Sequence, residues 1–591
     1  MNKWLKSFLI FLIVVITIGY FYWVLPLWGM PFNAQRHGQL PLTPSWVLEP
    51  WLWEDDVNTA AYVDELLDGY KEHDIPVRTI VLDSPWSLRY NDFEVDTDRY
   101  PEPEKWFRKL QDNDYRVVLW MTSMVNSYSN DTKIQNSEKW YNEAKAKGYL
   151  CGGDEQNKWW KGKGGFVDYT NPEAMKWWRG MQEKVFDYGI DGWKLDGTAT
   201  MFWTDIFGIP FLYKKTHQGM LTARQYMDLY YREEYFYGLS KNPEFVTLSR
   251  SIDHRWRHPE GYTPFDASPV NWVGDQSHTW EGEAQEEGDY KGKKDLAFEG
   301  EEGIGMALTH IMQSAELGYN IVGSDIAGFS GSTIPPRLYM RWTQFSTFCG
   351  LFMNGGHSER RLWKRTEEEL EVIRKFTWLH KELVPYMYHY VVTAHNGSRR
   401  LQTPLEKGKY HYMFGDYLLV APIYKDSKTK DVVLPEGKWR YFFDDKEIVE
   451  GGKTLVRDFP MDEFPVYVKE GAIIPMSIER DYTGFGTKES AGRITFLIYP
   501  SGKNSFAFYQ LDKPKEVTNV SYETGNSTLK INVEGNPVSH ILSVSLKDVP
   551  ATVTCNGSEL EQGSGWSYDA KKQRLTITGT EKNGIYKVFI K

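Results

Sequence analysis

Residues 191–197 read Asp-Gly-Trp-Lys-Leu-Asp-Gly, a short apolar run that ends abruptly at Asp196 and a turn. A second run of the same kind occupies residues 271–275, reads Asn-Trp-Val-Gly-Asp, and ends at Asp275. Short apolar runs bounded by turn-forming residues are typical of buried strands. The two stretches therefore predict two buried strands, each of which carries a carboxylate at its carboxyl end.

Similar apolar stretches alternate with amphipathic ones over the first two thirds of the chain. The predicted strands cover residues 46–48, 77–82, 116–121, 192–195, 245–248, 270–273, 320–322 and 348–353. The predicted helices cover residues 60–72, 104–113, 172–188, 224–237 and 303–317. This alternation is typical of a (β/α)8 TIM barrel, an α/β fold. The alternative is a doubly wound open sheet, although no Gly-rich phosphate loop follows the first strand.

Polar or indole side chains stand at the ends of most predicted strands. They are Glu49, Asp83, Trp120, Asp196, Arg250, Asp275 and Asp325. A single aspartate after a strand is a common turn former, but four aspartates after four strands are harder to explain in that way. Because strand carboxyl ends form the active-site face of a TIM barrel, this set predicts an active site there.

Helical periodicity ends near His395, and short strands then alternate with turns as far as Lys591. This texture predicts all-β modules. We therefore expect a signal anchor and linker over residues 1–42, a (β/α)8 barrel over 43–395 and two all-β modules over 396–485 and 486–591.

The N-terminus predicts a transmembrane helix. Lys3 and Lys6 precede an apolar run over residues 8–28, which at about 1.5 Å per residue spans a hydrocarbon core of about 30 Å. Because no small-residue cleavage site follows the run, we expect an uncleaved signal anchor with its lysines in the cytoplasm. The alternative is a cleaved signal peptide. Both place the catalytic body outside the cytoplasm, in a periplasmic, extracellular or luminal space.

Composition narrows the possible partners. The net charge of −11 argues against nucleic acid. The 24 tryptophans offer flat apolar faces with polar edges, which suit sugar rings, although large barrels and sandwiches also have aromatic cores. The three cysteines, Cys151, Cys349 and Cys555, are few and far apart, so we expect neither a disulfide framework nor a metal cluster.

Two carboxylates at strand ends are what glycoside hydrolysis requires. Lys194 and Asp196 should point the same way along a strand, and a neighbouring cation would keep Asp196 ionised, as a nucleophile requires. The alternative is a structural ion pair. Asp275 follows an apolar, aromatic stretch, and such a setting raises the pKa of a carboxyl and suits a general acid. The alternative is that Asp275 shapes a turn beside Gly274.

Other polar residues are candidates for binding the sugar. Arg250 could donate a forked pair of hydrogen bonds to hydroxyls or to a carboxylate. Asp83 and Asp325 could accept hydrogen bonds from hydroxyls. His357 is weaker evidence, because a lone loop histidine is usually solvated.

These residues stand in motifs that resemble those of glycoside hydrolase family 31. The barrel motifs are Asp196 at its strand end, Ser249-Arg250-Ser251, Trp272-x-Gly274-Asp275, residues 323–329 (Gly-Ser-Asp-Ile-x-Gly-Phe) and residues 341–345 (Arg-Trp-Thr-Gln-Phe). Residues 414–422, 434–439 and 465–475 agree downstream. The resemblance covers roughly residues 43–500 and implies a retaining α-glycosidase with a barrel followed by proximal and distal β-sandwiches.

The resemblance also implies residue roles. By motif, Asp196 is the nucleophile and Asp275 the acid/base. The side chains expected to bind the sugar are Asp83, Trp86, Trp120, Lys194, Arg250, Trp272, Asp325 and His357. No metal ion or organic cofactor is expected.

The chain departs from the family pattern at several points. Only about forty residues precede the barrel, where the family usually has a β-sandwich, so we expect a more open pocket. Gly197-Thr198-Ala199 stands where family α-glucosidases often have Met-Asn-Glu, and Lys194 resembles members that cleave α-xylosides or α-galactosides. The arginine that usually accompanies His357 is missing from residues 353–357.

The sequence therefore predicts a membrane-anchored exo-α-glycosidase that hydrolyses terminal sugars of an oligosaccharide or glycoside, with galactose or xylose as possible glycones. Within enzymes the alternative is an α-transglucosylase, in which a sugar hydroxyl replaces water. Outside enzymes it is a catalytically silent carbohydrate-binding relative. Loss of either carboxylate would favour the silent relative, and both are present.

Overall fold

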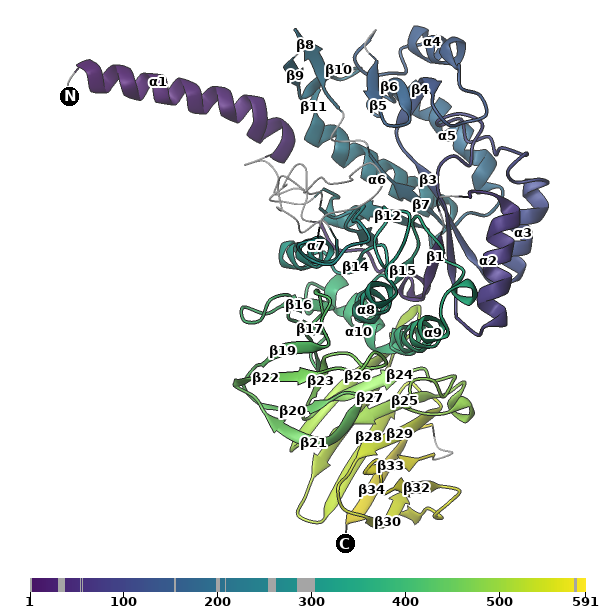
Figure 1. Ribbon diagram of the computed structural model, residues 1–591, viewed down its shortest axis with the longest axis vertical. Coiled ribbons are helices and arrows are strands. Elements are labelled where there is room, and N and C mark those ends of the chain that lie inside the picture. Colours follow the sequence, from purple (N-terminus) through teal and green to yellow (C-terminus); the bar gives the residue numbers. More distant parts are fainter. Residues whose placement is uncertain are drawn as a thin grey trace. The chain divides into compact units, whose positions relative to one another are not determined.

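The computed structural model (Figure 1) describes residues 3–29, 38–53, 55, 57–153, 156–197, 202–207, 209–252, 262–283, 303–578 and 582–590. The chain divides into two compact units. The first comprises residues 1–41, 53–65 and 79–273, and the second comprises residues 42–52, 66–78 and 274–591.

An eight-stranded parallel sheet forms the TIM barrel. Its strands are β1 (Trp51–Trp53), β2 (Thr79–Leu82), β3 (Arg116–Met121), β7 (Gly192–Leu195), β12 (Val246–Arg250), β13 (Val270–Trp272), β14 (Val322–Gly323) and β15 (Met353–Asn354). Their order, β14-β13-β12-β7-β3-β2-β1-β15, is sequential around the sheet. A doubly wound sheet would reverse its order at a switch point, so the barrel prediction is confirmed. The strands are almost wholly buried, which explains why they are apolar without alternation.

Helices follow the barrel strands. They are α2 (Ala60–Glu72), α3 (Pro103–Asp112), α5 (Pro172–Phe186), α6 (Ala223–Lys241), α7 (Ile304–Leu317), α8 (Pro336–Ser346), α9 (Glu367–Glu382) and α10 (Val384–His395). Of these, α2, α3, α5, α6 and α7 correspond to the predicted amphipathic stretches, and α8, α9 and α10 were not predicted. Side chains fix several starts: Asn171 caps α5, and Thr222 and Gln225 form a capping box at α6.

Two excursions that the sequence analysis did not predict interrupt the barrel in the first unit. After β3 come β4 (Met124–Ser129), α4 (Glu138–Ala146), β5 (Asn157–Trp159) and β6 (Gly162–Phe166), whose strands form a three-stranded sheet. After β7 come two hairpins: β8 (Thr204–Ile206) with β9 (Ile209–Phe211), and β10 (Tyr213–Thr216) with β11 (Gly219–Thr222).

The C-terminal part of the second unit is all β. A six-stranded sheet and a two-stranded sheet use β16 (Gln402–Pro404), β17 (Tyr412–Phe414), β18 (Leu418–Val420), β19 (Thr429–Leu434), β20 (Lys438–Tyr441), β21 (Asp444–Glu450), β22 (Lys453–Asp458) and β23 (Val466–Lys469). A five-stranded sheet has β24 (Ile473–Met476), β25 (Ile494–Ile498), β29 (His540–Ser545), β32 (Trp566–Asp569) and β33 (Arg574–Ile577). A second six-stranded sheet has β26 (Lys503–Gln510), β27 (Lys513–Thr524), β28 (Thr528–Gly535), β30 (Pro550–Cys555), β31 (Ser558–Glu559) and β34 (Gly584–Ile590).

The first predicted strand is wrong. Residues 46–48 lie in a 3-10 helix, η3 (Ser45–Leu48), and the first barrel strand is instead β1. A three-residue apolar run does not by itself distinguish a strand from a helical turn. Glu49 consequently does not end a strand, and its carboxylate pairs with Arg78 at 3.6 Å. The last two predicted strands exist but shorten to the two-residue β14 and β15.

The N-terminal residues form α1 (Lys3–Gly19), which continues as a π-helical stretch, η1 (Tyr20–Trp28). Within the described residues, this is the one helix long and apolar enough to cross a membrane, and a signal sequence would have the same properties. The three cysteines are free thiols and all are buried.

Candidate active site

Asp196 directly follows β7 in the first unit and is held by two donors. Nε of Arg250, at the end of β12, lies 3.1 Å from its Oδ1, and Nε1 of Trp120, in β3, donates to its Oδ2 at 3.2 Å. The strands explain the arrangement, because β3 and β12 both pair with β7 in parallel register. A charged and a neutral donor on one half-buried carboxylate stabilise its negative charge.

Lys194 binds a carboxylate that the sequence analysis did not assign to it. Its Nζ donates to Oδ2 of Asp83 at 2.6 Å, and both side chains are buried. Lys194 thus pairs with Asp83, and Arg250 pairs with Asp196. The reason is geometric: inward side chains of a barrel meet across its interior, so a long lysine reaches a carboxylate two strands away in the sheet order.

Buried indoles surround these charged groups. The Lys194 ammonium lies 3.9 Å from the ring centre of Trp53, and the Arg250 guanidinium lies 4.6 Å from that of Trp272. Nε1 of Trp86 donates to the carbonyl of Trp120 at 2.7 Å. Cation–π contacts of this kind attract the two cations to the indole faces. Trp86, Trp120 and Trp272 thus pack behind the charged side chains, and direct contact of these indoles with a sugar stays a prediction.

Trp160 was missed by the sequence analysis. It follows β5, is 50% exposed, and lies so close to Gly197 that a Cβ there would be 2.3 Å from its ring. Its neighbour Trp159 stacks on Trp120 with ring centres 6.2 Å apart. The signal in the sequence was the Trp-Trp pair itself, but only the fold of the first excursion brings it beside the residue after Asp196. Thr198 and Ala199 lie outside the described residues.

Asp275 belongs to the second unit and follows Gly274, whose φ is +103°. The sequence analysis expected an apolar surrounding for its carboxyl, but the residue is exposed. The apolar residues before it are buried within the barrel wall, and the turn at Gly274 directs the chain out of that wall. The expected apolar enclosure of this carboxyl is therefore not seen among the described residues.

Asp325 and His357 lie on adjacent loops of the second unit. Asp325 is fully buried and bridges to Met353 in β15. The backbone N–H of His357 donates to the carbonyl of Phe329 at 2.9 Å, and the two rings are 4.6 Å apart. The structure thus joins the loop after β14 to the loop after β15.

Arg360 connects these two loops by hydrogen bonds. It was not among the residues predicted from the sequence. Its guanidinium is buried and donates to the carbonyls of Ile326 at 2.6 Å, Gly328 at 2.9 Å and His357 at 3.2 Å. The sequence analysis noted the missing arginine before His357. Arg360, just after that histidine, supplies a guanidinium to the same loop.

His278 lies beneath the same loop. Nδ1 is 2.7 Å from the carbonyl of Ala327, and Nε2 is 3.4 Å from the hydroxyl of Ser358. Burial, followed by the nearby Arg360 charge, lowers the pKa of His278 to about 3. The imidazole is therefore neutral at pH 7 and can take part in the loop's hydrogen bonds without adding a positive charge.

The described residues contain no group of three or more His, Cys, Asp or Glu that could hold a metal ion.

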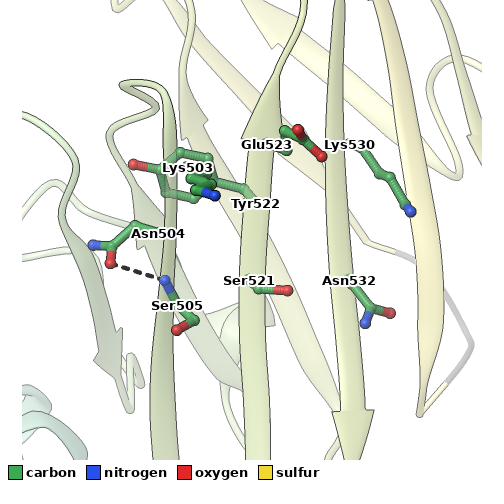
Figure 2. Close-up of a pocket in the computed structure, with 8 residues that line it drawn as sticks. All are labelled: Lys503, Asn504, Ser505, Ser521, Tyr522, Glu523, Lys530 and Asn532. Atoms are coloured by element: carbon green, nitrogen blue, oxygen red, sulfur yellow. Dashed lines mark hydrogen bonds between the residues drawn. The ribbon is translucent and has the colours of Figure 1, made fainter.

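A hollow on the sheet of β26, β27 and β28 is lined by Lys503, Asn504, Ser505, Ser521, Tyr522, Glu523, Lys530 and Asn532 (Figure 2). Glu523 sits in register between Lys503 and Lys530 on β26 and β28, a pattern typical of a solvated sheet face. The hollow has a single carboxylate and so lacks the pair that glycoside hydrolysis needs.

Comparison with known proteins shows which family this chain belongs to. A family model described as the glycosyl hydrolases family 31 TIM-barrel domain matches residues 40–286 and 299–390, and the C-terminal domain of the same family matches residues 388–474. The alpha-xylosidase of Emericella nidulans is 26% identical, over 84% of this chain and 60% of that protein. The isomaltosyltransferase of Sporosarcina globispora is 25% identical, over 91% and 52%.

Solved structures show the same fold. A family 31 dextranase of Flavobacterium johnsoniae in complex with glucose has a TM-score of 0.77 at 22% identity, covering 93% of this chain and 71% of that one. The cycloalternan-forming enzyme of Listeria monocytogenes has a TM-score of 0.78 at 22% identity, covering 94% and 55%. The chain spans about half to two thirds of the length of the curated relatives it matches.

Proposed function

Because this chain belongs to glycosyl hydrolase family 31, we propose that it is a retaining exo-α-glycosidase that removes terminal α-linked sugars by double displacement. The observation that supports this proposal is the carboxylate of Asp196, which accepts hydrogen bonds from Arg250 and from Trp120. A carboxylate positioned by two donors at the end of a barrel strand is suited to attack an anomeric carbon.

In the first step, Oδ of Asp196 attacks the anomeric carbon as the bond to the leaving oxygen breaks. Asp275 donates its proton to that oxygen, and the aglycone departs as an alcohol. A β-linked glycosyl-enzyme results. Exposure of Asp275 is compatible with this role, because the acid must reach the leaving group from outside the buried barrel wall.

In the second step, Asp275 acts as a base. It takes a proton from water, the water oxygen bonds to the anomeric carbon, and the bond to Asp196 breaks. The sugar leaves with its original α configuration. Arg250 and Trp120 again stabilise the carboxylate as negative charge returns to Asp196.

We propose that Lys194 and Asp83 together select the glycone. Their buried ion pair places a fixed donor and acceptor in the barrel interior, where sugar hydroxyls would exchange hydrogen bonds with them. The similarity to alpha-xylosidases over 75–84% of this chain supports a glycone other than plain glucose. Asp325 and His357 would add contacts from the loops that Arg360 holds together.

Transglycosylation is the second candidate, because the isomaltosyltransferase match extends over 91% of this chain. The chemistry is the same as far as the glycosyl-enzyme, and a sugar hydroxyl then replaces water. Product analysis at rising acceptor concentration separates the two candidates: a transferase forms longer oligosaccharides in preference to free sugar.

We further propose that the protein is anchored in a membrane through α1 and η1, with its body outside the cytoplasm. The lysines at positions 3 and 6 and the apolar helix of residues 3–28 support this topology. The catalytic body would then act on oligosaccharides or glycosides in the external space.

One screen tests the proposed activity. Nitrophenyl α- and β-glycosides of xylose, galactose and glucose are supplied, and the first-formed sugar anomer is followed by proton NMR. The proposal expects turnover of α-glycosides with the α-sugar appearing first. Turnover of α-glucoside more than about tenfold above α-xyloside and α-galactoside, equivalent to about 1.4 kcal/mol, would contradict the glycone assignment.

A further inference from the structure

The two hairpins after β7 expose large apolar side chains at their turns. Phe207, in the β8–β9 turn, is 101% exposed, Ile209 beside it is 56% exposed, and Met220 in β11 is 58% exposed. We call these three residues the apolar tips. Large apolar residues exposed on successive hairpins are a feature of surfaces that meet a membrane or another apolar partner.

The hairpins form one connected element. The hydroxyl of Thr204 in β8 donates to the carbonyl of Tyr213 in β10 at 2.8 Å, and the rings of Phe211 and Tyr213 stack with centres 4.7 Å apart. The apolar tips are therefore carried by one structure and not by two independent loops.

The same element is bonded to the N-terminal helix, within the first unit. The hydroxyl of Tyr22 donates to the carbonyl of Pro210 at 3.0 Å, and the hydroxyl of Tyr213 donates to the carbonyl of Phe21 at 2.8 Å. η1 also packs against β11 and α6. Residues 21 and 22 of the helix thus fix the position of the hairpins.

The length of the helix indicates where this attachment lies relative to the outer surface of the membrane. A hydrocarbon core of about 30 Å takes about 20 helical residues, and counted from Ser7, just after Lys6, these end near Pro26. Phe21 and Tyr22 fall within about one turn of that outer boundary. Aromatic residues are typical of a membrane interface, and three of them, Tyr20, Tyr22 and Trp23, lie in this part of the helix.

We propose that the apolar tips insert into the acyl–headgroup boundary of the membrane that the N-terminal helix crosses. The inference rests on the anchoring part of the proposed function. A lipid surface is the occupant because Pro210, between Ile209 and Phe211, is hydrogen-bonded to a helix residue at the boundary level. Ile209, next to Pro210, and the other apolar tips on the same hairpins would otherwise face water where the bilayer begins.

Insertion of the apolar tips would also restrict rotation of the catalytic body about the N-terminal helix. A chain held by one helix alone can rotate about it, whereas a second attachment beside the helix restricts that rotation. The second excursion begins shortly after Asp196 in the chain. Lipid contact would therefore hold the segment that follows β7 at the membrane surface.

The test uses the full chain in phosphatidylcholine nanodiscs. Because Cys151, Cys349 and Cys555 are buried, single cysteines can be introduced and labelled with an environment-sensitive fluorophore. Ile209→Cys and Met220→Cys report on the apolar tips. Val456→Cys, at a residue 67% exposed on β22, is the matched control, and Leu9→Cys in α1 reports on the anchor itself.

The inference predicts that labels at positions 209 and 220 emit at shorter wavelength than the label at position 456. It also predicts that brominated lipid quenches them and that aqueous iodide does not. Labels at 209 and 220 that behave like the control, while the Leu9→Cys label is quenched by lipid, would overturn the inference and leave the anchor standing. If the label at position 9 also behaves like the control, both the anchor and the inference are wrong.

Discussion

Nε of Arg250 lies 3.1 Å from Oδ1 of Asp196, and the two side chains are 11% and 13% exposed. A guanidinium this close and this well shielded from water stabilises a carboxylate more than a surface pair does. The relationship links the end of β12 to the end of β7, so the parallel sheet itself supplies the environment of the proposed nucleophile.

Replacing Arg250 with alanine should reduce kcat/KM by about 10- to 100-fold, because a hydrogen bond to a charged group contributes about 1.5–3 kcal/mol. Steady-state kinetics on a nitrophenyl α-glycoside measures the loss. Arg399→Ala is the matched control, since Arg399 is 65% exposed and pairs with Asp416 on the surface. Equal kinetics for Arg250→Ala and the control would remove Arg250 from the site.

The ion pair of Lys194 and Asp83 should show strong coupling in folding stability. Lys194→Met alone leaves a buried carboxylate without its cation, and breaking a buried pair in this way costs about 3–5 kcal/mol. The double variant Lys194→Met/Asp83→Leu should regain much of that loss. Urea unfolding of both single variants and the double variant gives the coupling energy. Simple additivity would contradict the structure; the more exposed pair of Lys109 and Asp64 serves as the comparison.

His278 should make the protein less stable as pH falls. Its folded pKa is lowered to about 3 from 6.5, so between these values the unfolded chain binds a proton that the folded one does not. Stability is then present above pH 6.5 and is lost as pH falls toward 3, by at most about 1.4 kcal/mol per pH unit.

The measurement for His278 is the free energy of unfolding at pH 7 and at pH 5. Other buried groups also titrate here; burial raises the pKa of Glu382 to about 8, for example. The quantity to compare is therefore the difference between the parent protein and His278→Gln. That variant should lose less stability than the parent between the two pH values, and an identical loss would contradict the assignment.

Membrane attachment should survive an alkaline carbonate wash, because the helix of residues 3–28 is apolar throughout its centre. Fractionation with N-terminal sequencing checks this. Recovery of the protein in the soluble fraction, with a mature N-terminus near residue 30, would show that the helix is a cleaved signal peptide.

Much of the barrel could be predicted because its strands and helices follow local rules. β3 and β7 coincide with their predicted ranges, and α2 does so for all of residues 60–72. Each is a long amphipathic stretch or a buried run bounded by turn formers. The stretch over residues 46–48 failed because three apolar residues fit a helical turn as well as a strand.

The partners within the site were harder to predict. Lys194 and Asp196 are two residues apart, so local spacing favoured their pairing, but the lysine side chain reaches Asp83 through the barrel interior. The contact of Trp160 with Gly197 and the bonds from Arg360 to the loops after β14 and β15 come from excursions and loops whose paths depend on tertiary contacts. Strand ends thus indicate which residues face the site, whereas their hydrogen-bond partners depend on side chains from distant strands.

We assign Asp196 as the nucleophile and Asp275 as the acid/base. Sodium azide added to Asp275→Ala with a nitrophenyl α-glycoside tests this assignment, and Asp98→Ala, at a surface residue, is the control. An activated leaving group needs little protonation, so the β-glycosyl-enzyme should form and wait for a base. Azide needs no base, and its attack on that intermediate should restore turnover and release the α-glycosyl azide. In Asp196→Ala, by contrast, azide can only attack the substrate directly and would give the β-glycosyl azide. Absence of azide rescue in Asp275→Ala, or release of the β-glycosyl azide from it, would contradict the account.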